Sequence, residues 1–351
     1  MALSRNLPFS GPSWRTGILS QPQQIVPKCR EFFKSSLVCC RGSAGGGGGR
    51  SLRPSNTVPD TLASRVETIK LENRPLNSSC LIRPAIFTVA FSTTSLACAT
   101  IWQYENLRAK RLVHSTVEWF NNRTYKYGHF RKEANNWWNS LSEGQKIFYP
   151  ICFLNAVVFL AWKVPSFQTT MARYFFSNPV AKNNCWPMVL SAFSHYSALH
   201  IFANMYVLHS FSTGAVLMMG KEQFVGFYMA AAVVSSFASY VCKVALSKPG
   251  FSLGASGAIM AVLAYTCVKN PDSLLNIIFL PMITFKAGMA LKAVMAFDTA
   301  GVVLGWTIFD HAAHLGGALF GVFWAHYGYS YMHFQRQHIF PLWHQLRSKN
   351  N

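Results

Sequence analysis

The feature that most constrains this 351-residue sequence is a series of apolar segments, most of them long enough to cross a lipid bilayer. A transmembrane helix needs about 20 apolar residues, because the hydrocarbon core of a bilayer is about 30 Å thick. The composition agrees with this reading, since 51% of the residues are hydrophobic and only 13% are charged. The sequence therefore predicts an all-α membrane protein with several spans.

The apolar segments form one isolated helix followed by a group of six. The first span is predicted at residues 82–104, and a polar stretch at 105–145 separates it from the others. Six further spans are predicted at 146–163, 188–212, 223–246, 254–269, 284–304 and 309–331. The segments 164–187 and 270–283 are too polar or too interrupted by proline to span. The expected arrangement is one plus six, seven spans in total.

This layout divides the chain into four parts. Residues 1–59 form a basic leader, residues 60–145 hold the first span and the polar linker, residues 146–331 form the core of six spans, and residues 332–351 form a short C-terminal tail. Basic residues lie on both sides of the first span, so the charge distribution does not fix the orientation of the protein in the membrane. The lipid bilayer is the main solvent expected for the core.

The leader has the composition of a mitochondrial transit peptide. It contains a single acid, Glu31, many serines, and the basic residues Arg5, Arg15, Lys28, Arg30, Lys34, Arg41, Arg50 and Arg53. A secretory signal would need a continuous apolar stretch of about 7–15 residues, and no such stretch occurs before residue 80. A disordered basic tail is the alternative interpretation. We expect import into mitochondria.

The formal charge of +20 does not indicate a nucleic-acid partner. The basic residues flank apolar segments instead of covering an aromatic-rich soluble surface. The nine cysteines show neither CxxC spacing nor the CxxC…HxxxH spacing of a zinc site, and several lie within apolar segments. No disulfide framework, metal or other cofactor is therefore expected.

Ionisable and polar residues are costly inside a bilayer and usually functional, and the predicted spans contain several of them. In the second core span, His200 and Asn204 are four residues apart and share one helix face. Two polar residues that join helices inside the bundle would explain this pair equally well. His195 lies nearby, in the same predicted span.

A serine and a histidine in two other spans form a candidate reactive pair. Ser256 lies between Gly254 and Gly257 at the expected start of the fourth core span. In the sixth core span, His314 is followed by two small residues on one face, Gly317 and Gly321. These four glycines are predicted to let the two helices pack closely around the pair, which brings the imidazole within hydrogen-bond reach of the serine.

The three strings HxxxN (200–204), GxSG (254–257) and AHxxGxxxG (313–321), in this order, resemble the rhomboid family of intramembrane serine proteases. The resemblance covers about residues 146–331, and the additional first helix with its leader is similar to the mitochondrial members of the family. It implies a Ser256–His314 dyad without a third acid. It also implies an oxyanion hole made by the Ser256 backbone N–H and the side chains of His200 and Asn204.

The resemblance further implies an inner-membrane enzyme that cleaves single-span transmembrane proteins and acts in mitochondrial fusion and quality control. A dynamin-like fusion GTPase and a mitophagy kinase are the implied substrates. Many bacterial members carry a tyrosine four residues after the serine, stacked on the histidine, where this sequence has Met260. The histidine must therefore be positioned by something else. Asp310, one helical turn before His314, is expected to satisfy a helix end instead of joining the dyad.

Other classes fit the sequence less well. A metalloprotease is disfavoured because the sequence lacks HExxH. An intramembrane aspartyl protease is disfavoured because neither Asp298 nor Asp310 lies in a GxGD string. A proton-coupled transporter leaves the GxSG string unexplained and lacks a detectable inverted repeat. A catalytically inactive rhomboid-like protein that binds transmembrane helices is the alternative that stays open.

Overall fold

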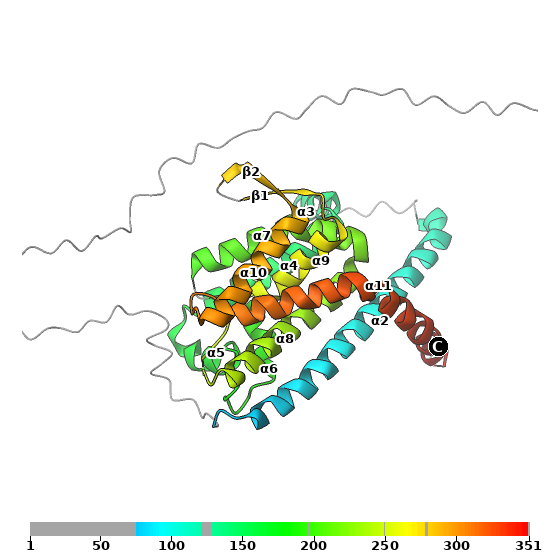
Figure 1. Cartoon of the computed structure of the whole chain (residues 1–351). Helices are drawn as coiled ribbons and strands as arrows, with labels where there is room; N and C mark the ends of the chain where they lie inside the picture. The colour runs from blue at the N-terminus through cyan, green and yellow to red at the C-terminus, as the bar shows by residue number, and fades with distance from the viewer. Residues whose placement is uncertain (1–74, 121–127, 196, 249, 278–279, 350–351) are drawn as a thin grey trace, which may run out of the picture. The chain divides into compact units, whose positions relative to one another are not determined.

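The computed structural model describes residues 75–120, 128–195, 197–248, 250–277 and 280–349, and helices make up most of these ranges. The predicted transit peptide at residues 1–59 lies outside the described residues. The long helices are α2 (Ile82–Phe120), α3 (His129–Ser140), α4 (Glu143–Ala161), α7 (Ala198–Met219), α8 (Lys221–Ala245), α9 (Ser256–Lys269), α10 (Ala287–Leu304) and α11 (His311–Ser348). Figure 1 shows α4 and α7 to α11 gathered into one bundle.

Shorter elements connect the long helices. They are the 3-10 turns η1 (Ser78–Leu81), η2 (Pro165–Phe167) and η3 (Ser191–Phe193), the helices α5 (Gln168–Tyr174) and α6 (Trp186–Leu190), and the strands β1 (Leu274–Ile277) and β2 (Leu280–Lys286). The two strands pair antiparallel, with Leu274 opposite Lys286. The segments 164–187 and 270–283, predicted not to span, therefore contain short helices or this hairpin.

Five helical segments within the described ranges are long and apolar enough to cross a membrane. They are Ser78–Leu112, Glu143–Ala161, Ala198–Met219, Lys221–Ala245 and Ala287–Leu304. α9 is apolar but only 14 residues long. The expectation of a mostly helical, multi-pass membrane protein is confirmed.

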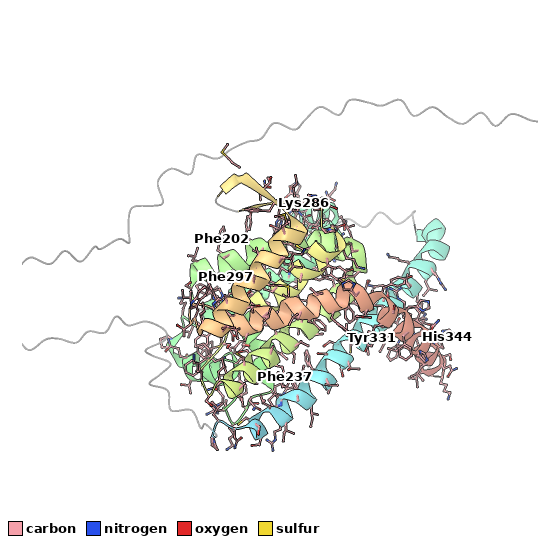
Figure 2. All side chains as sticks on the ribbon, viewed as in Figure 1. Phe202, Phe237, Lys286, Phe297, Tyr331 and His344 are labelled. Atoms are coloured by element: carbon pink, nitrogen blue, oxygen red, sulfur yellow. The ribbon has the colours of Figure 1, made fainter. Side chains whose placement is uncertain are left out.

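The interior of the bundle is built around α9, which packs against α7, α8, α10 and α11. Small residues face these neighbours, because Ala258, Ala261 and Ala264 are at most 1% exposed. Large apolar side chains point outward instead: Phe202 and Phe297, labelled in Figure 2, are 59% and 49% exposed. Apolar exteriors of this kind suit contact with lipid.

The additional helix α2 runs along α8 and crosses α11, as Figure 1 shows. Its contacts include a buried polar group, in which the Thr100 hydroxyl donates to the Gln335 amide oxygen over 3.0 Å and accepts from Gln223 over 3.2 Å. Further along the crossing, Tyr104 Oη lies 2.7 Å from Nδ1 of His344, a residue labelled in Figure 2. Polar contacts between helices help to fix their relative rotation in a membrane.

Two predicted helix starts are wrong. The span predicted to start at residue 188 begins as α7 only at Ala198, because the chain becomes extended at Ser194 and the Ser197 hydroxyl caps the new helix by accepting from the His200 N–H. His195 therefore precedes the helix. The span predicted from residue 284 begins at Ala287, because residues up to Lys286 pair in the hairpin.

Three helices continue past their predicted spans. α7 ends at Met219, although its span was predicted to end at residue 212. α2 runs on to Phe120, although its apolar segment was predicted to end at residue 104. α11 runs from His311 to Ser348, through the residues predicted as a C-terminal tail. A hydropathy pattern marks where a helix is apolar but not where its backbone hydrogen bonds stop, which explains these differences.

Candidate active site

The backbone around Ser256 is shaped by the residues just before α9. Gly254 has a φ of +124°, a conformation that favours glycine, and its N–H donates to the carbonyl of Ser191 over 2.9 Å. The Ala255 N–H points to Nε2 of His195 at 3.5 Å. Ser256 is then the first residue of α9, so its own N–H belongs to the first turn, where a helix provides no carbonyl partners.

Ser256 and His314 come together across the α9–α11 interface. The Oγ atom of Ser256 lies 2.8 Å from Nε2 of His314, which is a normal hydrogen-bond distance. Both side chains are partly accessible. The structure therefore brings the predicted serine and histidine into direct contact.

Glycines let the two helices approach closely enough for this contact. A Cβ added to Gly317 would lie 2.0 Å from the carbonyl oxygen of Gly257, and one added to Gly321 would lie 2.3 Å from the carbonyl oxygen of Ala261. Gly257 also makes room for α8, since its Cβ would lie 2.4 Å from Ser235 Oγ. Gly254 has a different neighbour: its Cβ would lie 3.0 Å from the imidazole of His200.

His200 and Asn204 lie on α7 next to this site. The contact between Gly254 and the His200 ring brings that imidazole to the start of α9. The Asn204 side chain is 7% exposed, and its amide donates to the His200 carbonyl over 2.9 Å. This bond stays within one helix, and the second N–H of the amide is not used by it.

Asp298, which was not among the predicted site residues, lies next to His314. Oδ1 of Asp298, on α10, lies 2.7 Å from Nδ1 of His311 and 3.3 Å from Nδ1 of His314. The Asp298 side chain is 2% exposed and that of His311 3%. A signal was present in the sequence, because Asp298 is an ionisable residue inside an apolar segment.

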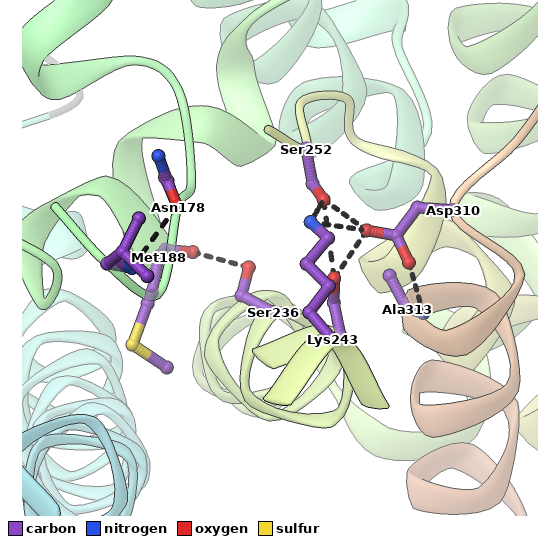
Figure 3. Close-up of polar contacts among 9 residues, drawn as sticks. Asn178, Met188, Ser236, Lys243, Ser252, Asp310 and Ala313 are labelled. Carbon is purple, nitrogen blue, oxygen red and sulfur yellow. Dashed lines mark hydrogen bonds and ion pairs between the residues drawn. The ribbon is translucent and has the colours of Figure 1, made fainter. Parts of the chain in front are cut away.

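Asp310 has the helix-end role expected for it. It is the N-cap of α11, where its Oδ1 accepts from the Ala313 N–H over 3.0 Å. Its other oxygen accepts from the hydroxyls of Ser239 and Ser252 and lies 3.5 Å from Nζ of Lys243 (Figure 3). Lys243 also donates to Ser252, so the group ties α8, the loop before α9 and the start of α11 together.

Met260, which stands four residues after Ser256 on α9, is partly buried. It packs against the buried residues of the Ala264 and Cys267 cluster. The ring of Phe309 lies beside the imidazole of His314, with the two centroids 6.1 Å apart and an interplanar angle of 31°. Asp298 and Phe309 are thus two neighbours that can help to hold the imidazole of His314.

The three strings of the sequence analysis lie within a region of the chain that matches a known family. The model of the Rhomboid domain matches residues 182–331. The mitochondrial presenilin-associated rhomboid-like protein of Bos taurus is 50% identical over 289 residues, which cover 81% of this chain and 77% of that protein. The Homo sapiens protein of the same name is 48% identical, with 95% and 90% covered.

A more distant relative keeps the same family name and compartment. Rhomboid protein 1, mitochondrial, of Saccharomyces cerevisiae is 33% identical over 195 residues, which cover 55% of this chain and 56% of that protein. Identity of about one half along most of the sequence, together with the matched domain, identifies this multi-pass membrane protein as a member of the rhomboid family, among its mitochondrial presenilin-associated rhomboid-like proteins.

Proposed function

We propose that this protein is an intramembrane serine endopeptidase of the mitochondrial inner membrane, with Ser256 as nucleophile and His314 as general base. The observation that carries the proposal is the 2.8 Å contact between Ser256 Oγ and His314 Nε2 at the start of a helix. A serine hydroxyl is a weak nucleophile until a neighbouring base accepts its proton. The membership of the rhomboid family supports the same chemistry.

The reaction follows from the position of the two groups. Oγ of Ser256 attacks the scissile carbonyl carbon while its proton passes to Nε2 of His314, which gives a tetrahedral oxyanion. The C–N bond then breaks, and His314 returns the proton to the leaving amine. Water attacks the remaining ester and gives one proton to His314, the Oγ–carbonyl bond breaks, and the serine regains its proton. The products are one carboxyl and one amino terminus.

The oxyanion is expected to bind at the start of α9. The Ser256 N–H is free of helical partners there, and the His200 imidazole lies beside Gly254. Asn204 adds a second amide N–H from the same face of α7. Each such donor is typically worth about 2.7–4 kcal/mol in the transition state.

The short length of α9 supports a site below the membrane surface. Its 14 residues span about 21 Å, whereas the hydrocarbon core is about 30 Å thick. If the end of α9 near Lys269 lies at one surface, Ser256 at the other end stays within the bilayer. With α9 and α11 proposed as spans beside the five long apolar segments, the proposed arrangement is one plus six, seven spans in total.

Substrates of such a site are single-span helices with small or helix-breaking residues near the cut. A helical carbonyl is engaged in a backbone hydrogen bond, so the segment must unwind before Ser256 can reach it. Water must also enter, because it hydrolyses the acyl-enzyme. The dynamin-like fusion GTPase and the mitophagy kinase implied by the family resemblance are the candidates to test first.

A rhomboid-like protein without catalytic activity is the alternative function. It would keep the fold to bind transmembrane helices and would have no need for a hydroxyl aligned with an imidazole. The 2.8 Å contact therefore favours the enzyme.

Covalent labelling tests the proposal directly. Purified full-length protein in liposomes is treated with a fluorophosphonate probe and assayed with a single-span substrate. We expect labelling and cleavage in the wild type and neither in Ser256→Ala. The matched control is Ser210→Ala, which removes an exposed hydroxyl bonded to the Tyr206 carbonyl on α7 and should behave as wild type. Cleavage by folded Ser256→Ala would refute the serine mechanism.

A further inference from the structure

We infer that Asp298 is a positioning residue for His314: it holds the imidazole by its Nδ1 atom, and His311 in turn holds the Asp298 carboxylate. The inference rests on the proposed function. It extends the Ser256–His314 pair by Asp298 and His311, so that the group has four residues on the three helices α9, α10 and α11. Its basis is the single oxygen, Oδ1 of Asp298, that lies within hydrogen-bond reach of Nδ1 in both histidines.

Burial gives this carboxylate a strong requirement for donors. Asp298 is 1% exposed, and an ionised carboxyl group that has left water is stable only when hydrogen bonds or opposite charges replace its hydration. Among the described residues, the hydrogen-bond partners of this carboxylate are the two imidazole nitrogens, at 2.7 and 3.3 Å. Each of these nitrogens must carry a hydrogen for the carboxylate to accept it.

The same requirement fixes the tautomer that the serine needs. With its hydrogen on Nδ1 facing Asp298, His314 leaves Nε2 as an acceptor. That atom is the one that lies 2.8 Å from Ser256 Oγ. The opposite tautomer would place a hydrogen between Nε2 and the serine and could not accept its proton. Asp298 therefore selects the form of His314 that can act as a base.

His311 is held so that it can anchor the carboxylate. Its ring fills the space over Gly301, where an added Cβ would lie 2.4 Å from the imidazole. The rings of Phe297, Trp306 and Phe309 lie around it with centroids 5.4, 5.8 and 5.9 Å away. Its Nε2 is buried without a partner among the described residues, as expected when the hydrogen is on Nδ1.

Because one oxygen of Asp298 contacts both histidines, Asp298 has two possible roles: a structural partner of His311 or a positioning residue for His314. Its contact to His311 is shorter, so a purely structural pair with His311 would leave the 3.3 Å contact to His314 without effect on chemistry. A positioning role requires that the contact matters when His314 receives the serine proton and becomes positively charged. A nearby carboxylate stabilises that imidazolium, which exists only during turnover.

The deciding experiment compares Asp298→Asn with Asp272→Asn in the full-length protein in liposomes. Both changes remove one carboxylate, but Asp272 is on the surface, with its side chain 83% exposed and paired with Lys286. The measurements are kcat and KM for a single-span substrate, the rate of fluorophosphonate labelling at Ser256, and the melting temperature in detergent. Activities are expressed per folded molecule.

We expect Asp298→Asn to lower kcat and the labelling rate about 10- to 100-fold with KM nearly unchanged, a smaller loss than in soluble triads because the contact is long and shared. Asp272→Asn should match the wild type. His311→Asn should lose less activity than Asp298→Asn, because its amide can still donate to the carboxylate. Wild-type kcat per folded molecule in Asp298→Asn would overturn the inference.

A second pair of variants covers the case in which Asp298→Asn does not fold. His311→Leu keeps the carboxylate and its contact to His314, whereas Asp298→Leu with His311→Leu removes both buried polar partners and leaves no orphaned charge. A lower kcat in the double variant than in His311→Leu supports the inference, and equal values overturn it. A folded wild-type protein that neither reacts with the probe nor cleaves would instead refute the proposed protease function.

Discussion

Nε2 of His314 lies 2.8 Å from Oγ of Ser256, although 58 positions separate the two residues in the chain. The contact depends on α9 and α11 meeting at Gly257 and Gly317, where no side chain separates the backbones. Asp310 caps the helix that carries the histidine, and its contacts extend to Ser252 in the loop that leads to the serine. Helix packing at the glycines and helix capping by Asp310 thus both help to position Ser256 and His314.

Alanine substitutions at Ser256 and His314 should not be additive. Each single variant should lose cleavage of a transmembrane substrate to the assay background, on the order of 10⁴–10⁶ in kcat for related Ser–His systems, and the double variant should be no worse. The physical reason is that neither group is useful without the other. Measured kcat per folded molecule checks this, and a double variant much slower than both singles would contradict it.

Asn204→Ala separates an oxyanion role from structural packing. If the amide binds the oxyanion, kcat should fall roughly 10²–10³-fold with little change in melting temperature, because the charge exists only in the transition state. Packing alone predicts a destabilisation of about 0.6 kcal/mol and unchanged turnover per folded molecule. We expect the catalytic outcome, since the bond recorded for this amide stays within α7 and joins no second helix.

The chain offers a matched control for Asn204. Asn155, on α4, is buried and donates to the Ile151 carbonyl over 2.7 Å, the same bond to the residue four positions earlier. Asn155→Ala should change the melting temperature at least as much as Asn204→Ala while leaving turnover per folded molecule near the wild-type value. Equal effects of the two substitutions on kcat would remove Asn204 from the site.

Gly317→Ala should separate the reactive pair by forcing α9 and α11 apart. The new Cβ would meet the Gly257 carbonyl oxygen at 2.0 Å, and backbone atoms cannot move aside as a flexible side chain can. We expect a destabilisation of about 1–3 kcal/mol and a loss of turnover beyond the loss of folded protein. Gly214→Ala on α7, whose nearest contact would be 3.9 Å away, is the control and should be nearly neutral in both measurements.

Deletion of residues 2–55 tests the predicted transit peptide. This segment is basic and contains a single acid, Glu31, so import driven by the membrane potential should depend on it. We expect the deleted form to stay outside mitochondria, and the imported full-length product to run shorter than its translation product on a gel. Import of the deleted form, with no shortening of the intact one, would show that the transit-peptide prediction is wrong.

The sequence by itself determined the membrane class, the family and the approximate positions of most helices. Hydropathy is a local property, so an apolar segment can be recognised from its own residues whatever it packs against. The motifs around Ser256 and His314 are also local strings, and their order along the chain was readable without coordinates. The role of Asp310 at a helix start followed from its position one turn before His314.

Tertiary structure alone decided which polar residues meet. Asp298 was visible in the sequence as a charge in an apolar segment, but its contact with His314 depends on how α10 packs against α11. The start of α7 after His195 depends on a cap at Ser197, and the start of α10 depends on a short hairpin in which two consecutive strands pair with each other. Hydrophobic patterning is insensitive to all three. Hydropathy does not report the hydrogen bonds of a helix cap or of a strand pair, and contacts between helices are set by side-chain shape and hydrogen-bond geometry in three dimensions.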